Sequence, residues 1–514
     1  GQTRPPGPAR KIRPARMWIV WWPLVFAFAA LASAAPVGKS HYGIVFDAGS
    51  SGTRIHVYTW RTGGGGPKDA FDLVSDELLK IKPGLSAYKD RPSEAGASLE
   101  PLLAFARSKI PAELIASTPM FLMATAGLRL VGEATKDAIL ASVCGYLGST
   151  GFLFRCEWAT LLDGRDEGLY GWVTVNYLLD ALYPGGAQPA GTIDLGGGSV
   201  QIVFPTPAVA PSSAPAELSQ RLDFGGRSHA LHVRQREGRE RAERGPREAP
   251  PVSSSQLGRV VAPPSPSLQV KSHLGLGLDS ARTSLLDLVA QRPGEPHPCL
   301  PIGASVTHKG SVVQGAGDYR RCKKLTKRLF DGEACSYGER MCSFGGVYQP
   351  PLPKRFYGFS YMFDRTAAIG LLDQKPVTFG AAEMSRDDIE RAAKAVCSLD
   401  QAGAAARFAA TNDAAKAANF CGDTVYIAAL LDALGFDERS TMTMTNKIKD
   451  VELVWTLGAM LAQSSALASG ASGSHFGALS WLALAATLAG LWYFCLGPGS
   501  RPSGPPRLYN RPPP

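Results

Sequence analysis

The stretch YGIVFDAGSSGTRIHVYTW, residues 42–60, decides the fold. Apolar residues alternate on both sides of a Gly/Ser turn, a pattern that predicts two strands joined by a short loop. The segment GTIDLGGGSVQIVF, residues 191–204, repeats the pattern. Asp47 and Asp194 each end the first strand of a copy and stand two residues before a glycine. One copy would be a common turn, but two copies predict two related domains that present their loops to a shared cleft.

Helical patterns separate the predicted strands. Residues 99–116 carry Leu, Phe and Ile at helical spacing, interrupted by Pro111, and Gly168 to Leu182 has an apolar face. Residues 120–130 are typical of a buried strand that runs into a loop of small residues. This alternation of strands and helices predicts an α/β fold.

Length and charge limit the class of protein. A chain of 514 residues is long enough for two sizeable cores. Its net charge of +10 arises from 54 Lys and Arg against 44 Asp and Glu. Residues 1–16 carry +5, residues 497–514 carry +3 and residues 234–259 carry +3, which leaves −1 for the rest. The basic balance therefore does not indicate a nucleic-acid surface, and we expect no nucleic-acid partner.

Two hydrophobic runs flank the central part of the chain. Residues 17–36 follow a basic tail and fit either a signal peptide cut near Ala34 or an uncut signal anchor. Residues 476–496 are uncharged and predict a transmembrane helix after a Ser/Gly/Ala linker at 464–475. Arginines outside both runs predict cytosolic tails at 1–16 and 497–514 and a lumenal or extracellular middle, in the Golgi or at the plasma membrane. Membrane lipid is then a partner, and a homo-oligomer formed through these segments stays open.

Cysteine usage agrees with a translocated domain. Eight cysteines lie between the hydrophobic runs, an even number that predicts four disulfides, although spacing alone leaves 105 pairings open. No Cys-x2-Cys pair occurs, which argues against a structural zinc site. The absence of an Asn-x-Ser/Thr sequence predicts no N-glycosylation.

A low-complexity insert interrupts the second half. Residues 205–217 are rich in Pro, Ala and Ser, and the Arg/Glu stretch within 235–267 has no apolar period, so we expect a disordered insert there. Because 222–233 and 268–278 resemble adjoining strands, removal of the insert is expected to leave folding and hydrolysis nearly unchanged.

The two Gly-rich loops indicate phosphate chemistry. Backbone N–H groups in loops of glycine and small hydroxyl residues can hold phosphate oxygens. Asp47 and Asp194, at the strand ends, suit a hydrated Mg2+ or Ca2+ ion. No Gly-x4-Gly-Lys-Ser/Thr sequence occurs, so the P-loop class is excluded. The pair Asp166 and Glu167 before the predicted helix is compatible with simple capping or with a general base that activates water.

Five segments in order resemble the signature regions of the apyrase, or nucleoside triphosphate diphosphohydrolase, family. They are DAGSSGTR (47–54), ATAGLR (124–129), DGRDEGLYGWVTVNYLL (163–179), DLGGGSVQI (194–202) and VWTLGAML (454–461). The segment SHLGLG (272–277) is also similar to a family motif. The resemblance covers about 40–463 outside the insert. Gly198, Val200 and the sequence CSYGERMCSFGG (335–346) look more like the plant-type branch than the vertebrate cell-surface branch.

The resemblance implies a role for individual residues. Glu167 would be the catalytic base, Ser199 and Gln201 would hold the attacking water, and Thr125 would support the loop beside the terminal phosphate. Asp47 and Asp194 would organise the cation, largely through water. The phosphate chain would be held by Ser50, Ser51, Gly52, Thr53, Arg54, Gly196, Gly197 and Gly198. Phe363 and Lys416 would enclose the nucleobase. The implied disulfides are Cys299–Cys322, Cys335–Cys342, Cys397–Cys421 and, as the remaining pair, Cys144–Cys156.

The family also implies an actin-like fold of two RNase H-like lobes. Lobe I would comprise 41–165 and 446–463, and lobe II 166–445. The implied activity is divalent-cation-dependent hydrolysis of nucleoside tri- or diphosphates to monophosphates and phosphate. Two alternatives stay open: another actin-like ATPase, such as a sugar kinase or an exopolyphosphatase, and a non-catalytic lumenal or adhesion module.

Overall fold

The computed structural model describes Gly1 and residues 38–467. Within that range it leaves out 50–51, 66–67, 184, 207–219, 225–226, 234–266, 293, 333, 339–340, 373–380, 412 and 439. The predicted membrane segments at 17–36 and 476–496 lie outside the described residues. Within the described part, no helix has both the length and the hydrophobicity needed to cross a bilayer. One compact unit extends to Ala459 and contains both large sheets. The segment 455–467 is helical, so 464–467, which we expected in a linker, belong to a helix.

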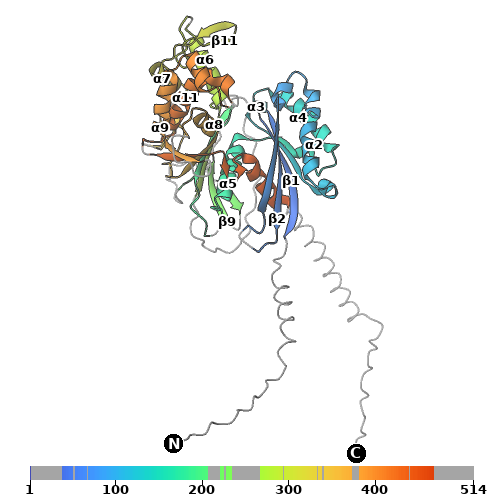
Figure 1. The fold of residues 1–514 in the computed structure, drawn as a ribbon. Helices are drawn as coiled ribbons and strands as arrows, with labels where there is room; N and C mark the ends of the chain where they lie inside the picture. The colour runs from blue at the N-terminus through green and yellow to red at the C-terminus, as the bar shows by residue number, and fades with distance from the viewer. Residues whose placement is uncertain are drawn as a thin grey trace, which may run out of the picture. The chain divides into compact units, whose positions relative to one another are not determined.

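The first sheet has five strands in the order β3-β2-β1-β4-β5. Figure 1 labels β1 and β2, which lie side by side in it. Its strands are β1 (Lys39–Ala48), β2 (Thr53–Thr62), β3 (Asp72–Ile81), β4 (Met120–Ala124) and β5 (Ala159–Leu161). The helices that follow these strands are α2 (Glu100–Lys109), α3 (Ala126–Arg129) and α4 (Glu133–Gly148). The predicted hairpin is confirmed, because β1 and β2 pair antiparallel from Lys39–Thr62 to Ala48–Thr53. Six consecutive buried residues end β1, so the loop after Ala48 starts from the core.

The second sheet has eight strands in the order β14-β15-β13-β6-β7-β10-β9-β8. Its strands are β6 (Gly191–Leu195), β7 (Ser199–Thr206), β8 (Gln220–Phe224), β9 (Arg227–Val233), β10 (Ser267–Leu274), β13 (Phe356–Ser360), β14 (Ala382–Ser385) and β15 (Thr441–Met444). The associated helices are α6 (Leu278–Ala290), α7 (Tyr319–Lys327), α8 (Tyr361–Ala368), α9 (Arg386–Cys397), α10 (Gln401–Arg407) and α11 (Phe420–Ala433). Two short ladders, β11–β12 (Ser305–His308, Ser311–Gln314) and β16–β17 (Lys447–Ile448, Val451–Glu452), complete the strands among the described residues.

The two sheets share one topology. In the first, β1 pairs antiparallel with β2 and parallel with β4, and β5 continues the parallel side. In the second, β6 pairs antiparallel with β7 and parallel with β13, and β15 continues the parallel side. Each sheet has its own buried apolar cluster. The duplication that the two hairpins predicted is therefore confirmed, and the chain has a two-lobed α/β fold.

Helix α5 (Gly164–Leu178) is buried on nearly all sides. It begins four residues before the predicted helix at 168–182, because Asp163 caps it by accepting from the Arg165 N–H at 2.7 Å. It also ends four residues before the predicted end. Glu167 therefore lies in the first turn instead of preceding the helix. The helix contacts β6, β7 and β10 of the second sheet, and its Tyr177 hydroxyl donates to Phe71 O at 3.0 Å, just before β3. This helix thus connects the two lobes.

The fifth sequence motif packs on α5. The Thr174 hydroxyl donates to Val454 O at 2.9 Å and accepts from the Gly458 N–H at 2.9 Å. The Thr456 hydroxyl bonds Tyr58 of β2 at 2.8 Å. The motif is therefore a structural bridge between β2 and the helix that carries Glu167.

The strands beside the insert run parallel. Ala230 and Val233 of β9 pair with Ser267 and Val270 of β10. Ser267 is thus part of a strand, so the insert expected at 235–267 ends by 266, and residues 235–266 lie outside the described part. Parallel neighbours need a connection that returns along the sheet, usually a dozen residues or more. A complete deletion would remove that connection, which corrects our expectation that deletion is harmless.

We predict that replacing 235–266 with a Gly/Ser linker of about 14 residues leaves folding and phosphate release within about twofold of wild type, because the linker spans the return path. Joining residue 234 directly to residue 267 should instead lower the melting temperature and the soluble yield. Thermal unfolding and phosphate release measured on both variants test this. Loss of activity in the linker variant would show that the Arg/Glu stretch itself packs or binds.

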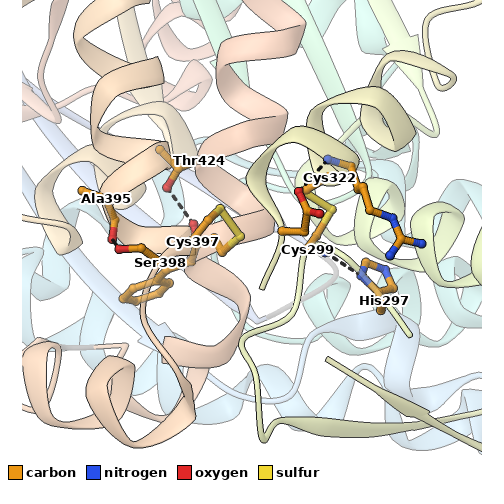
Figure 2. Close-up of a disulfide and its surroundings, with 11 residues drawn as sticks. His297, Cys299, Cys322, Ala395, Cys397, Ser398 and Thr424 are labelled. Carbon is orange, nitrogen blue, oxygen red and sulfur yellow. Dashed lines mark hydrogen bonds between the residues drawn. A yellow bond between two sulfur atoms is a disulfide. The ribbon is translucent and has the colours of Figure 1, made fainter. Parts of the chain in front are cut away.

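All four implied disulfides are confirmed. They are Cys144–Cys156, Cys299–Cys322, Cys335–Cys342 and Cys397–Cys421. Figure 2 shows two of them near the amino end of α11: one joins Cys397, the last residue of α9, to Cys421 in α11, and the other joins the segment at Cys299 to α7. The two bridges are close together, since a Cβ built on Gly422 would lie 3.2 Å from Cys299 Cβ.

Candidate active site

A cavity of about 300 Å³ receives side chains from both lobes. Asp47 and Thr125 line it from the first lobe, and Asp194 lines it from the second. The loops of the two lobes meet there, because a Cβ built on Gly198 would lie 2.7 Å from the Cβ of Ala126. Only glycine at 198 permits this approach. Gly49 of the first predicted loop lines the cavity together with Gly196 and Gly197 of the second, so both predicted loops reach it.

Glu167 reaches the cavity from the first turn of α5 and is 8% exposed. The Arg129 Nη2 donates to its Oε2. Burial raises the pKa of Glu167 to about 8, although the Arg129 guanidinium opposes the rise, and Asp194 and Asp47 add to it. A carboxyl with this pKa can both accept and release a proton near neutral pH, as a general base must.

Asp47 and Asp194 are both buried beside the cavity. Asp47 Oδ2 accepts from Arg54 Nη1 at 2.8 Å. Burial raises the pKa of Asp194 to about 6; a hydrogen bond from Ser360 opposes the rise and the nearby Asp47 adds to it. Ser360 has φ +54°, a conformation that costs a non-glycine residue about 1–3 kcal/mol. The strained residue thus carries a hydroxyl that touches the cavity carboxylate.

The second glycine loop is held by the amino end of α6. The N–H groups of Leu278 and Asp279 donate to Gly196 O at 2.9 Å and Gly197 O at 3.0 Å. Gly277 caps α6 directly against the loop, and a Cβ built on it would lie 2.3 Å from Ser199 N. The segment that contains Gly277 therefore fixes the position of the loop.

A polar pair follows that loop. Gln201 Nε2 donates to the Ser199 hydroxyl at 2.8 Å and to the Ser272 hydroxyl at 3.1 Å. Gln201 Oε1 is buried and has no hydrogen-bond partner among the described residues. An unpaired buried acceptor is costly, so this oxygen is suited to accept from a bound water.

The far wall of the cavity contains Tyr361, Asp413 and Lys416. The buried Arg365 holds it, because Nη2 donates to Asp413 Oδ2 at 2.6 Å and the guanidinium lies 5.1 Å from the centre of the Tyr361 ring. Lys416 Nζ is 3.5 Å from Asp413 Oδ1. The wall therefore combines an aromatic ring with charged groups. These residues lie far along the sequence from the glycine loops.

The model of the GDA1/CD39 (nucleoside phosphatase) family matches residues 35–234 and 265–472. The chain belongs to this family. Ectonucleoside triphosphate diphosphohydrolase 5 of Gallus gallus is 30% identical over 82% of this chain and 87% of its own length. Probable apyrase 1 of Oryza sativa subsp. japonica is 32% identical over 83% of each. A nucleoside triphosphate hydrolase structure from Neospora caninum has a TM-score of 0.54 and 14% identity over 86% of this chain and 95% of that one.

The matches establish a family hydrolase of the nucleoside triphosphate diphosphohydrolase or apyrase type. Animal and plant relatives are similar to the chain at nearly the same identity, so the plant-type branch stays a prediction. The structure from Neospora caninum supports the two-lobed fold.

Most of the residues that the family resemblance implied meet at the cavity. Those that line it are Asp47, Arg54, Thr125, Glu167, Asp194, Gly196, Gly197, Gly198, Ser199 and Lys416. Gly52, Thr53, Gln201 and Phe363 do not line it, and Ser50 and Ser51 lie outside the described residues. Phe363, like Tyr361, packs against the core of the second lobe, but Phe363 does not reach the cavity. Tyr361, two positions earlier, lines the wall that we had assigned to Phe363.

The sequence reasoning missed several residues of the family site. Arg129 ends the motif ATAGLR and pairs with Glu167, although of the two residues Thr125 and Arg129 only Thr125 lines the cavity. Lys80 and Lys82 reach the cavity from the end of β3 and the residue after it. Their sequence carries no phosphate-binding pattern, because only the pairing of β3 with β2 brings them there.

Proposed function

We propose that the chain hydrolyses nucleoside tri- and diphosphates to monophosphates and phosphate, using a divalent cation and a base-activated water. The observation that carries this proposal is the convergence of Glu167, Asp47, Asp194 and both glycine loops on one cavity. A non-catalytic scaffold would not need a buried carboxyl of raised pKa beside two such loops. A sugar kinase would need a second substrate site, and no sequence motif of this chain indicates one.

The residues present divide the chemistry between them. Glu167 accepts the proton of the attacking water, and Arg129 holds its carboxyl in place. The Ser199 hydroxyl, which lines the cavity, holds that water, and Gln201 holds the hydroxyl from behind through its Nε2. Backbone N–H groups of the loop at 196–198 and the Arg54 guanidinium contact the phosphate oxygens. These donors stabilise the charge that spreads over the transferring phosphoryl group.

The cavity fits a cation that arrives with the substrate. Seven carboxylates and four cationic side chains line it, so a polyphosphate alone would meet net negative charge. No three His, Cys, Asp or Glu side chains among the described residues form a metal-binding group. Asp47 and Asp194 would therefore hold Mg2+ or Ca2+ together with waters and phosphate oxygens. The cation would neutralise part of the phosphate charge.

We further propose that Tyr361 and Lys416 contact the nucleobase, in place of the Phe363 and Lys416 pair. Tyr361 offers a ring face and Lys416 a positive charge at the same wall. The four disulfides suit a lumenal or extracellular domain, and we place it in the Golgi or at the plasma membrane, anchored through 476–496. The division into lobe I (41–165 and 446–463) and lobe II (166–445) is also kept as a proposal.

Phosphate release from ATP, ADP, UDP and GDP by the purified protein tests this function. We expect release with Ca2+ or Mg2+ and a loss of at least 100-fold in excess EDTA, because the cavity repels an uncompensated polyphosphate. Re-addition of either cation should restore the rate. Full activity in EDTA would refute the cation, and absence of phosphate release under every cation would refute the hydrolase.

A further inference from the structure

A second charged surface lies away from the catalytic cavity. Helix α7 has the sequence YRRCKKLTK, and an open groove of about 990 Å³ runs beside it towards α9. We define the basic groove by the charged residues that line it: Arg320, Lys323, Lys324, Lys327, Lys394, Asp318 and Glu390. None of them lines the catalytic cavity.

The spacing of these cations along α7 places their side chains on one face of the helix. Arg320, Lys323, Lys324 and Lys327 are three or four residues apart, so they share one face of α7. The opposite face buries Cys322 and Thr326. The burial of that face therefore fixes the direction of the basic one.

The acidic residues nearby do not neutralise the groove. Glu390 Oε1 is 2.8 Å from Lys323 Nζ and 3.5 Å from Lys394 Nζ, so one carboxylate serves two cations. Arg320 and Lys324 are exposed and have no ion-pair partner among the described residues. Five cationic side chains against two carboxylates give the lining a formal charge of +3. Lys327 is also paired with Asp432 outside the lining, at 3.0 Å, so Arg320 and Lys324 carry the charge that remains unpaired.

Disulfides hold the two sides of the groove. Cys322 of α7 is bonded to Cys299, and Cys397 at the end of α9 is bonded to Cys421 of α11 (Figure 2). Both α7 and α9 also pack on α11. The backbone on both sides of the groove is thus held in place. A ligand that binds there loses less free energy to ordering of the protein.

We propose that the basic groove binds a linear sulfated polysaccharide. A chain with closely repeated anionic groups can contact Arg320, Lys324 and Lys327 in succession along the helix, whereas a single small anion would use one of them. A membrane surface fits less well, because no large exposed apolar side chain lines the groove to enter the lipid. A disulfide-bonded domain of the secretory pathway can meet such polysaccharides. This proposal rests on the lumenal or extracellular location proposed above and not on the hydrolytic activity.

The test uses the full chain and a fluorescent heparin oligosaccharide. Anisotropy titrations at several NaCl concentrations, without nucleotide, give the dissociation constant and its salt dependence. We expect Arg320→Glu/Lys324→Glu to weaken binding at least tenfold at 0.1 M salt and to reduce the slope of log Kd against log [NaCl] by about 1–2. Phosphate release should be unchanged, because the groove and the catalytic cavity share no residue.

Lys89→Glu/Arg91→Glu is the matched control. Both residues are exposed cations of the first lobe beside carboxylates, and the change in net charge is the same. Equal weakening in both variants would overturn the proposal in favour of general charge. Wild-type affinity of Arg320→Glu/Lys324→Glu for heparin would overturn the proposal and would indicate that the arginines at 234–259 bind it. Binding to phosphatidylserine vesicles should not depend on Arg320 and Lys324. If the double variant weakens vesicle binding as strongly as heparin binding, the proposal is overturned in favour of a membrane surface.

Discussion

Glu167→Gln is expected to lower kcat by about 10²–10⁴-fold while nucleotide still binds. The amide keeps the size of the side chain and an oxygen that can accept from Arg129, but it cannot take a proton from water. Burial disfavours the charged form of Glu167 in the folded protein, so removing the carboxylate should change the melting temperature little. Phosphate release and thermal unfolding of the purified variant measure both effects.

Asp166→Asn is the matched control for this change. Asp166 is the neighbouring carboxylate in the first turn of α5 and does not line the cavity. We expect its rate to stay within a few-fold of wild type. Comparable losses in both variants would indicate a general effect of charge at the helix start, and a Glu167→Gln enzyme at near wild-type rate would refute the base assignment.

The same assignment predicts a pH profile. A base must be deprotonated to act, so kcat of the wild-type enzyme should rise with pH through the pKa of Glu167, at or below about 8. A bound cation favours the carboxylate and moves this limb to lower pH. The residual rate of Glu167→Gln should lack the limb, because the titrating group is gone.

Gly277→Ala is expected to lower kcat/KM at least 100-fold and to destabilise the protein by about 1–3 kcal/mol. A Cβ at this position would lie 2.3 Å from Ser199 N and 2.4 Å from Gly197 C, which are backbone atoms that cannot turn away. The loop at 196–199 must then shift, and displacements of about 1 Å in a catalytic site cost on the order of 10²-fold in rate. Overpacking of a filled site costs about 1–3 kcal/mol. Steady-state kinetics and urea unfolding measure the two effects.

Gly145→Ala serves as the comparison. Gly145 lies in α4, and a Cβ built on it meets no atom within 4 Å. We expect unchanged kinetics and a gain of up to about 1 kcal/mol in unfolding free energy, since alanine is the better helix former. Wild-type activity in Gly277→Ala would show that the glycine loop does not depend on its packing against α6.

The chemistry of the site was accessible from the sequence because its residues lie in short motifs. The loops at 47–54 and 194–202 carry their strands, glycines and carboxylates within nine residues of one another, so alternation and turn chemistry identify them without a structure. Glu167 could be named only through the family motif, since local pattern alone left a helix cap and a catalytic base as alternatives. Its place in the first turn of α5 became clear from the Asp163 cap.

Tertiary structure decided what depends on contacts between distant residues. Arg129 meets Glu167 across 38 residues, and the strain of Ser360 is visible only in its backbone angle. Tyr361 lines the cavity and Phe363 does not, although both pack against the core of the second lobe, and only the tertiary structure shows this difference. Gly277 fits against the glycine loop only because β10 pairs with β7, and β9 and β10 pair in parallel, a direction that their apolar alternation does not encode. The sequence by itself determined the duplicated hairpins, the two glycine-rich loops and their carboxylates, because each is set by neighbours along the chain. The orientation of Glu167, the cavity wall and the direction of strand pairing were decided by the tertiary structure, because their partners are set by packing.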